Sequence, residues 1–230
     1  FFPFALFSEE LEVLLSTRSQ LLPLYLSAVK SDDSVYDWRY LEELRNILEF
    51  DLSTSGVCSL VETNAECSEQ LLSGGPQKSA HFSFWKKRKI PFLITLEAAQ
   101  GSFQVAAYQI EKESVKKDPQ FSLTSRLDAD RKQIHRLADW IQKDLFQAKG
   151  VSSLRLIYTQ RTPNPEHGAS DWLSEIWVCD SDGSSARQIT QQSAYCLTPY
   201  FFPKKLEDAD FYFVSHLGGQ SKIYKASLEN

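Results

Sequence analysis

The chain has 230 residues, a formal net charge of −5, 42% hydrophobic residues and 13% aromatic residues. These values are typical of a folded globular protein with one large domain or two smaller ones, and they exclude a disordered chain. The acidic balance argues against a nucleic-acid partner, and no apolar run reaches the roughly 18 residues of a transmembrane helix.

The first residues predict an exported protein. Residues 1–8 are apolar, and this run breaks abruptly at Glu9 and Glu10. The pattern is typical of the end of the apolar region of a secretory signal peptide. We therefore interpret residues 1–8 as a signal-peptide remnant, with a buried first strand as the alternative.

Residues 9–150 predict an α/β domain. Short apolar runs at residues 11–15 and 22–26 suit strands. A helix is predicted next, and residues 51–56 are expected to end it. Ser34 and Asp37 offer a capping box at its start. Its apolar stripe consists of Leu41, Leu44 and Leu48.

The middle of this domain is predicted to contain a hairpin. Residues 62–89 are polar and contain turn formers, and the basic run at residues 86–89 is interpreted as a solvated loop, with nucleic-acid or membrane contact as the weaker alternative. Residues 92–98 and 103–110 suit two strands joined by a turn at Gln100-Gly101. The charged residues 111–119 and a strand near residues 121–126 follow.

A second helix is predicted at residues 130–146. Gly150 follows it, and we expect the domain boundary there. The apolar stripe of this helix consists of Ile134, Leu137, Ile141 and Leu145.

The C-terminal third carries a repeated strand pattern. Strands are predicted at residues 174–180, 187–190, 210–215 and 222–226, with turns at residues 181–183 and 218–219. Ile157-Tyr158 recurs 55 positions later as Tyr212-Phe213, and Ile176-Trp177 recurs 47 positions later as Ile223-Tyr224. The loop at residues 161–173 is interpreted as the insertion that accounts for the difference. Short strands with an internal period predict two β-propeller blades over residues 151–230.

No catalytic or nucleotide-binding motif of the GxSxG, HExxH, GxxxxGKS or GxGxxG type occurs. The four histidines, His81, His135, His167 and His216, are scattered along the chain. For His135 we expect a structural hydrogen bond within the second helix region. The sequence therefore predicts no enzyme, no cofactor and no metal site.

Three further patterns permit a binding role. Asp180-Ser181-Asp182-Gly183 resembles the opening of a calcium loop but lacks the later ligands, so a turn between blade strands is predicted. The aromatic residues Trp177, Tyr212, Phe213 and Tyr224 are expected between blades rather than on a sugar platform. The cysteines lack zinc spacing; Cys58 with Cys67, or Cys179 with Cys196, would pair in an oxidising compartment, and free buried thiols are the alternative.

Over nearly its whole length the chain resembles the TolB family, the soluble periplasmic component of the Tol–Pal envelope system of Gram-negative bacteria. The resemblance rests on Leu44-Arg45-Asn46 at a helix end, the hairpin strand GSFQVAAYQI at residues 101–110, His135 with Asp139 in the second helix, and the blade segment at residues 174–190. One departure is the family's WSPDG turn, which stands here as FFPKK at residues 201–205 and lacks the Asp-Gly pair.

The resemblance implies an α+β fold, with an N-terminal α/β domain followed by the all-β blades of a six-bladed propeller, of which this chain carries the first two. With no third blade beside them, Phe211, Phe213, Ile223 and Tyr224 are expected to stay uncovered. It implies a periplasmic scaffold that links the C-terminal domain of TolA to the lipoprotein Pal, associates with the outer membrane through Pal, and supports envelope integrity and cell division. The segment that would engage TolA consists of Leu11, Glu12, Val13, Leu14, Leu15 and Ser16. The alternatives are the non-catalytic propeller portion of a periplasmic peptidase and a carbohydrate-binding propeller module.

Overall fold

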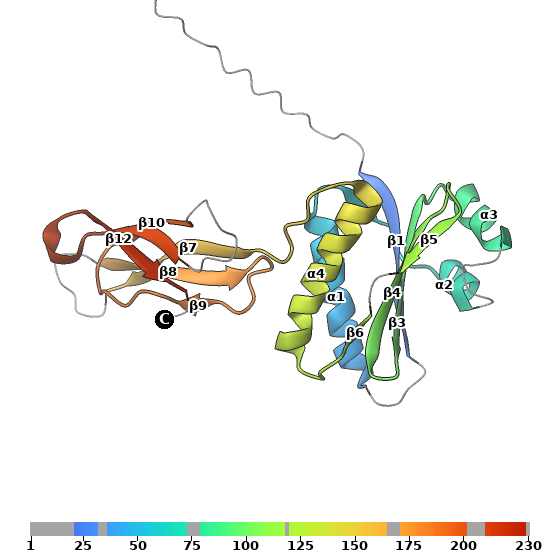
Figure 1. Ribbon diagram of the computed structural model, residues 1–230, viewed down its shortest axis with the longest axis horizontal. Coiled ribbons are helices and arrows are strands. Elements are labelled where there is room, and N and C mark those ends of the chain that lie inside the picture. The colour runs from blue at the N-terminus through green and yellow to red at the C-terminus, as the bar shows by residue number, and fades with distance from the viewer. Residues whose placement is uncertain are drawn as a thin grey trace, which may run out of the picture.

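The computed structural model describes residues 21–31, 36–72, 79–117, 120–164, 171–201 and 210–228. The signal-peptide remnant at residues 1–8, the strand expected at residues 11–15 and the capping residue Ser34 lie outside these ranges. The described chain forms an α/β unit, residues 21–146, and a blade unit, residues 155–228, which lie beside each other (Figure 1).

The α/β unit is a mixed sheet with helices on both faces (Figure 1). Its elements are β1 Leu22–Ser31, α1 Trp38–Thr54, β2 Cys58–Leu60, α2 Ala65–Leu72, α3 Ser79–Lys87, β3 Phe92–Ala99, β4 Ser102–Gln109, β5 Ser114–Lys117, β6 Phe121–Ser122 and α4 Leu127–Phe146. The strand order is β2-β1-β3-β4-β5, and β6 also pairs with β4. Strand β1 is parallel to both β2 and β3, whereas β4 pairs with its neighbours in antiparallel fashion.

Helices α1 and α4 cover one face of this sheet and contact each other. The predicted stripes of both helices are buried there, with Leu44, Leu48, Ile134 and Ile141 each 0% exposed. Ile94 and its neighbours on β3 supply the sheet side of the same core. The opposite face carries a second core around Tyr25, Trp85 and Leu93, to which α2 and α3 both contribute. The 3.6-residue and two-residue periods of the sequence therefore placed the residues of the first core correctly, whereas the second core was not predicted.

The β3–β4 hairpin is confirmed, with Ala99 paired to Ser102 across a two-residue turn. Gln100 and Gly101 both have positive φ, 51° and 75°. A right-handed twist of the strands favours such a turn, and glycine adopts this conformation without a steric penalty.

Several boundaries differ from the predictions. Helix α1 is capped by Asp37, whose side chain accepts from the Arg39 N–H at 3.0 Å, and it continues through Asp51 to Thr54. The polar stretch at residues 62–89 contains α2 and α3. Sequence composition missed these helices because they are short and each covers only part of the sheet.

The basic run is not simply a solvated loop, because Lys86 and Lys87 form the last turn of α3. Lys86 pairs with Glu113 at 2.7 Å, and Arg88 pairs with Glu66 and lies over the Phe84 ring. These carboxylates neutralise much of the charge that the sequence shows as a cluster. Strand β5 lies within the charged segment at residues 111–119, for which no helix or strand was predicted.

The blade unit consists of two three-stranded antiparallel sheets. The first is β7 Arg155–Pro163, β8 Trp172–Asp180 and β9 Arg187–Gln188; the second is β10 Cys196–Phe201, β11 Asp210–Ser215 and β12 Lys222–Ser227. The expected insertion at residues 161–173 is shorter than predicted, since Pro163 still pairs with Trp172. Among the described residues after Gly150, the only helical segment is the short 3-10 turn Leu217–Gly219.

Strand register confirms the internal repeat. In the first sheet, Ile157 pairs with Val178 and Tyr158 pairs with Trp177. The repeat equivalents, Tyr212 with Lys225 and Phe213 with Tyr224, pair in the second sheet in the same register. The β7–β8 and β11–β12 hairpins are therefore two copies of one unit.

The two sheets pack face to face through Ile176, Val178, Phe211 and Phe213, all buried. Phe211 and Phe213 were expected to face the position of a third blade and to stay uncovered, which is wrong, because both face the first sheet. Phe213 instead stacks on Tyr224, with ring centroids 5.7 Å apart, on the face that meets the first sheet.

The uncovered face of the second sheet carries a row of apolar side chains. Leu197 pairs with Val214, and Val214 pairs with Ile223, so the three lie side by side on one face. Ile223 is 77% exposed and Tyr200 is 63% exposed. Exposed contiguous apolar surface of this kind favours association, at roughly 25 cal/mol per Å² of apolar area removed from water.

We predict that the 230-residue chain self-associates through this face and that Ile223→Lys shifts it toward monomer, measured by sedimentation velocity over a concentration series. Val115→Lys, a matched change at a 38% exposed position on β5, should leave association unchanged. A wild-type chain that stays monomeric while the β12 amides are well protected from hydrogen exchange contradicts this expectation.

Candidate functional site between helix α4 and the first blade

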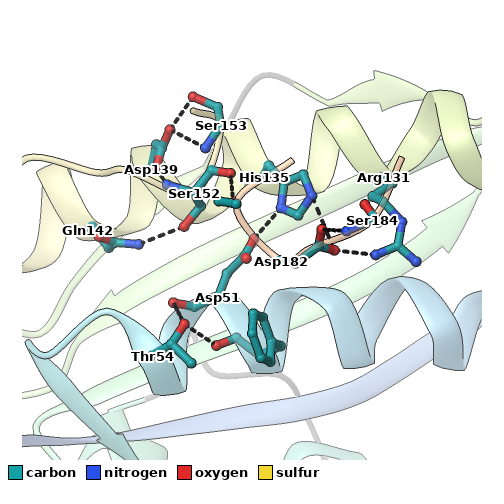
Figure 2. A network of polar contacts seen from close by, with 12 residues as sticks. Asp51, Thr54, Arg131, His135, Asp139, Gln142, Ser152, Ser153, Asp182 and Ser184 are labelled. Atoms are coloured by element: carbon teal, nitrogen blue, oxygen red, sulfur yellow. Dashed lines mark hydrogen bonds and ion pairs between the residues drawn. The ribbon is translucent and has the colours of Figure 1, made fainter. Parts of the chain in front are cut away.

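Helix α4 presents two different ridges. Its apolar stripe faces the sheet, whereas Arg131, His135, Asp139 and Gln142 recur at spacings of four, four and three residues and share another side. These four polar side chains contact the first blade and the linker, residues 147–154, that joins α4 to it (Figure 2). The helix therefore joins the core of the α/β unit to the blade unit.

Asp139 holds the second half of the linker through hydrogen bonds to Ser152 and Ser153. Its Oδ1 accepts the Ser152 N–H at 2.7 Å, and its Oδ2 accepts the Ser153 N–H at 3.1 Å as well as the Ser153 hydroxyl. Gln142 Nε2 donates to Ser152 Oγ at 3.2 Å. The chain reaches this position because α4 ends at Gln147 in the left-handed conformation and Gly150 then passes close to Asp139.

The turn between β8 and β9 lies against this linker. The Gly183 N–H donates to the Asp180 carbonyl at 2.9 Å, and Gly183 has a φ of +82° that glycine adopts readily. Ser181 Oγ donates to the Ser152 carbonyl. Asp182 accepts the Ser184 N–H at 2.9 Å and is thereby oriented toward α4.

His135 lies between two carboxylates at the centre of the network (Figure 2). Its Nδ1 is 2.7 Å from Asp51 Oδ2 on α1, and its Nε2 is 3.6 Å from Asp182 Oδ2 on the blade turn. Arg131 forms an ion pair with the same Asp182 oxygen. The side chains of His135, Asp51 and Asp182 are only 3%, 2% and 7% exposed, so these charges interact with little screening by water.

Burial would lower the pKa of His135, but the hydrogen bond and charge of Asp51, with the charges of Asp182 and Asp180, raise it above its ordinary value. Burial raises the pKa of Asp51, against the lowering effect of His135. Burial would also raise the pKa of Asp182, yet its hydrogen bonds with Ser184 and Arg131 lower it. The network thus favours a charged imidazolium beside an ionised Asp182.

The histidine and the acidic turn behave as the sequence suggested. His135 makes the expected structural hydrogen bond, and Asp180-Ser181-Asp182-Gly183 forms the expected turn. Sequence reasoning missed the two partners of His135. Asp51 was taken as a helix-ending residue, although it continues the stripe of Leu44 and Leu48 on the buried side of α1. The position of charged Asp51 on the apolar stripe of α1 was the signal in the sequence for a buried partner of this carboxylate.

Other predicted sites have different outcomes. The proposed TolA segment, Leu11, Glu12, Val13, Leu14, Leu15 and Ser16, lies outside the described residues, as does His167. The four cysteines are buried free thiols, so neither proposed disulfide is present. Of the aromatic residues, Phe213 and Tyr224 lie between the sheets as expected, whereas Trp177 and Tyr212 are not among the residues of that core.

The described part of the chain has neither a metal-binding cluster nor a membrane-spanning helix. No group of three or more His, Cys, Asp or Glu side chains there is arranged to hold a metal ion. None of the described helices has the length and apolar character needed to cross a membrane.

A cavity of about 370 Å³ lies at the β2 edge of the sheet, between Leu26, the α1 residues Arg45 and Glu49, and residues 60–63. Arg45 is already engaged there. It pairs with Glu49 at 2.7 Å and with Glu42 at 3.4 Å, and it donates to the Ser27 carbonyl. The cation at this cavity is therefore neutralised by the protein's own groups.

Comparison with known proteins identifies the fold and the relatives. The chain is 35% identical over 233 residues to "Protein TolB homolog" of Protochlamydia amoebophila, which covers all of this chain and 49% of that relative. It is 26% identical over 226 residues to "Protein TolB homolog" of Chlamydia felis, covering 98% of this chain and 47% of that protein. The crystal structure of TolB from Acinetobacter baumannii matches with a TM-score of 0.63 at 20% identity, over 91% of this chain and 47% of that one.

The chain is a TolB-like protein. Its α+β fold, with blade sheets after a mixed α/β unit, agrees with the Acinetobacter structure. The chain spans about half the length of the curated relatives it matches. No protein-family model matches it.

We predict that Asp51→Ala lowers the free energy of unfolding by about 3–5 kcal/mol, because it leaves His135 buried without its hydrogen-bonded carboxylate. Chemical denaturation measures this value. Asp144→Ala on α4 is the matched control, since it removes an ion pair to the 55% exposed Lys116 and should cost less than about 1 kcal/mol. Equal losses for the two variants would contradict the special role of the buried pair.

Gly150→Ala tests the close approach of the linker to α4. An added Cβ would lie less than 3.0 Å from the backbone and the carboxylate of Asp139, so the linker must move. We expect a loss of about 1–3 kcal/mol in thermal or chemical unfolding, as for overpacked sites. Lys149→Ala, at the neighbouring exposed position, should have little effect. Unchanged stability in Gly150→Ala would show that the linker does not need this path.

Proposed function

We propose that this chain is part of a periplasmic, non-catalytic scaffold of a Tol–Pal envelope complex, linking TolA to the lipoprotein Pal. The observation that carries the proposal is the similarity of the whole chain to TolB homologues, together with the matching fold. A relative from Xylella fastidiosa, 28% identical over 148 residues, is named "Tol-Pal system protein TolB", and it covers 62% of this chain and 32% of that protein.

Within this proposal the two units have separate tasks, with the boundary at Gly150. Residues 11–16 engage the C-terminal domain of TolA, and the propeller surface engages Pal, which associates the protein with the outer membrane. The polar ridge of α4 supports this division, because it gives the two units one defined arrangement without merging their cores.

A pull-down with purified partners tests the proposal. We expect the protein that carries this chain to bind both the TolA C-terminal domain and Pal. Deleting residues 9–16 should abolish TolA binding and leave Pal binding intact, because the proposal places the Pal surface on the propeller and not on this segment.

Deletion of residues 1–8, of equal length, is the matched control and should leave both interactions intact, since this segment is expected to be lost on export. Loss of both partners in the 9–16 deletion, with an unchanged circular dichroism spectrum, contradicts the assignment of this segment to TolA. Absence of binding in the unaltered protein contradicts the scaffold function itself.

A further inference from the structure

The two ring nitrogens of His135 have unequal surroundings. Nδ1 lies at hydrogen-bond distance from Asp51 within the α/β unit, whereas Nε2 points across to the blade unit. In the described part of the chain Nε2 is buried and has no hydrogen-bond partner, although Asp182 Oδ2 is 3.6 Å away. Nδ1 therefore has its partner within the α/β unit, whereas any partner of Nε2 must come from the blade unit across the interface.

The protonation state of His135 decides whether Nε2 attracts or repels the Asp182 carboxylate. Asp51 accepts only, when ionised, so Nδ1 carries the proton in a neutral ring and Nε2 presents a lone pair. A lone pair facing the Asp182 carboxylate is repulsive. In the imidazolium form both nitrogens are donors, and Nε2–H points at Asp182.

Charges from every neighbouring element act on this ring. Asp51 comes from α1, Asp182 and Asp180 come from β8 and its turn, and Arg131 and Asp139 lie one turn away on either side along α4. Arg131 partly neutralises Asp182, and Asp139 is engaged with the linker amides. The remaining field at His135 is negative, which favours a cation there.

We propose that His135 is a protonation-dependent latch, whose doubly protonated form holds the Asp182 turn of the first blade against the α/β unit. Loss of one proton to water leaves the Asp51 contact in place and releases the contact between His135 and Asp182, so that Arg131 alone on α4 still pairs with the Asp182 carboxylate. The inference goes beyond the proposed function. It involves neither TolA nor Pal, so the test of the latch is independent of the test of the scaffold function.

The pH window follows from the directions of the shifts. The pKa of His135 is raised by folding, so its stabilising contribution is complete below its ordinary value of about 6.5 and is lost as pH rises through the raised value. The pKa of Asp182 is lowered, so its contribution is present above about pH 4 and is lost as pH falls through the lowered value. The pKa of Asp51 is raised, so the contribution of its protonated form is lost as pH rises above about 4. The latch is closed between the two limits that Asp182 and His135 set.

Histidine NMR titration of the whole chain tests the latch. We expect the His135 ring to titrate above 6.5, with His135→Gln assigning its signal. Asp182→Asn should lower the His135 pKa by about one unit, because it removes a facing carboxylate charge. Arg131→Gln should raise that pKa, because it leaves Asp182 without its counter-charge. Asp144→Asn, on the same helix but paired with Lys116, is the matched control and should leave it unchanged.

Domain arrangement provides the second readout. Spin labels at the exposed positions Glu69 and Lys222 report the distance between the units, and the four native cysteines are buried. We expect a narrow distance distribution below the His135 pKa, a broader one above it, and a broad one at every pH in Asp182→Asn. Circular dichroism checks folding, and Arg131→Gln carries the test if Asp182→Asn does not fold.

Three results would overturn the latch. They are a wild-type His135 that titrates at or below 6.5, a His135 pKa that neither Asp182→Asn nor Arg131→Gln moves in the stated direction, and a label distance that does not respond to pH. A purely structural hydrogen bond of His135 would leave the label distance independent of pH.

Discussion

A buried imidazole flanked by carboxylates is the interaction on which the arrangement of the two units depends. Removing charged groups from water costs several kcal/mol each, and only close partners offset this cost. His135 therefore requires Asp51 on α1 at 2.7 Å, which aligns α1 with α4. The same side chain faces Asp182, so the position of the first blade is coupled to the packing of the two helices on the sheet.

The amphipathic helices and the hairpin were predictable because local periodicity reports burial directly. Leu44 and Leu48 on α1, and Ile134 and Ile141 on α4, follow the helical repeat and are buried. The blade repeat was equally readable, because a repeated cross-strand pair requires the same register in both copies. These features depend on neighbours within about ten residues or on self-similarity, both of which a single sequence displays.

The site was not predictable, because its partners are distant along the chain. Asp51 lies 84 residues from His135, and Arg131 lies 51 residues from Asp182. A two-residue period also assigns side chains to two faces of a strand without saying which face is covered. Phe211 and Phe213 were therefore expected to face a third blade and to stay uncovered, although they face the first sheet, which buries them. The helical conformation of Lys86 and Lys87, at the start of the basic run, was missed because the ion pairs of this run with Glu66 and Glu113 exist only in the folded chain.

The polar character of the contact has a consequence for how the two units are coupled. An apolar interface tolerates small rotations, since burial is non-directional, whereas a hydrogen bond weakens steeply when its angle falls or its length grows. Asp139 holds the linker amides at 2.7 and 3.1 Å, and Asp182 reaches α4 from the turn, so the blade is attached at two separate points of one helix. Two directional attachments along one ridge define an orientation, which a single attachment does not. Because neither the attachment at Asp139 nor the Arg131–Asp182 ion pair involves the titrating histidine, release at His135 would weaken the hold on the Asp182 turn while leaving the chain path itself in place.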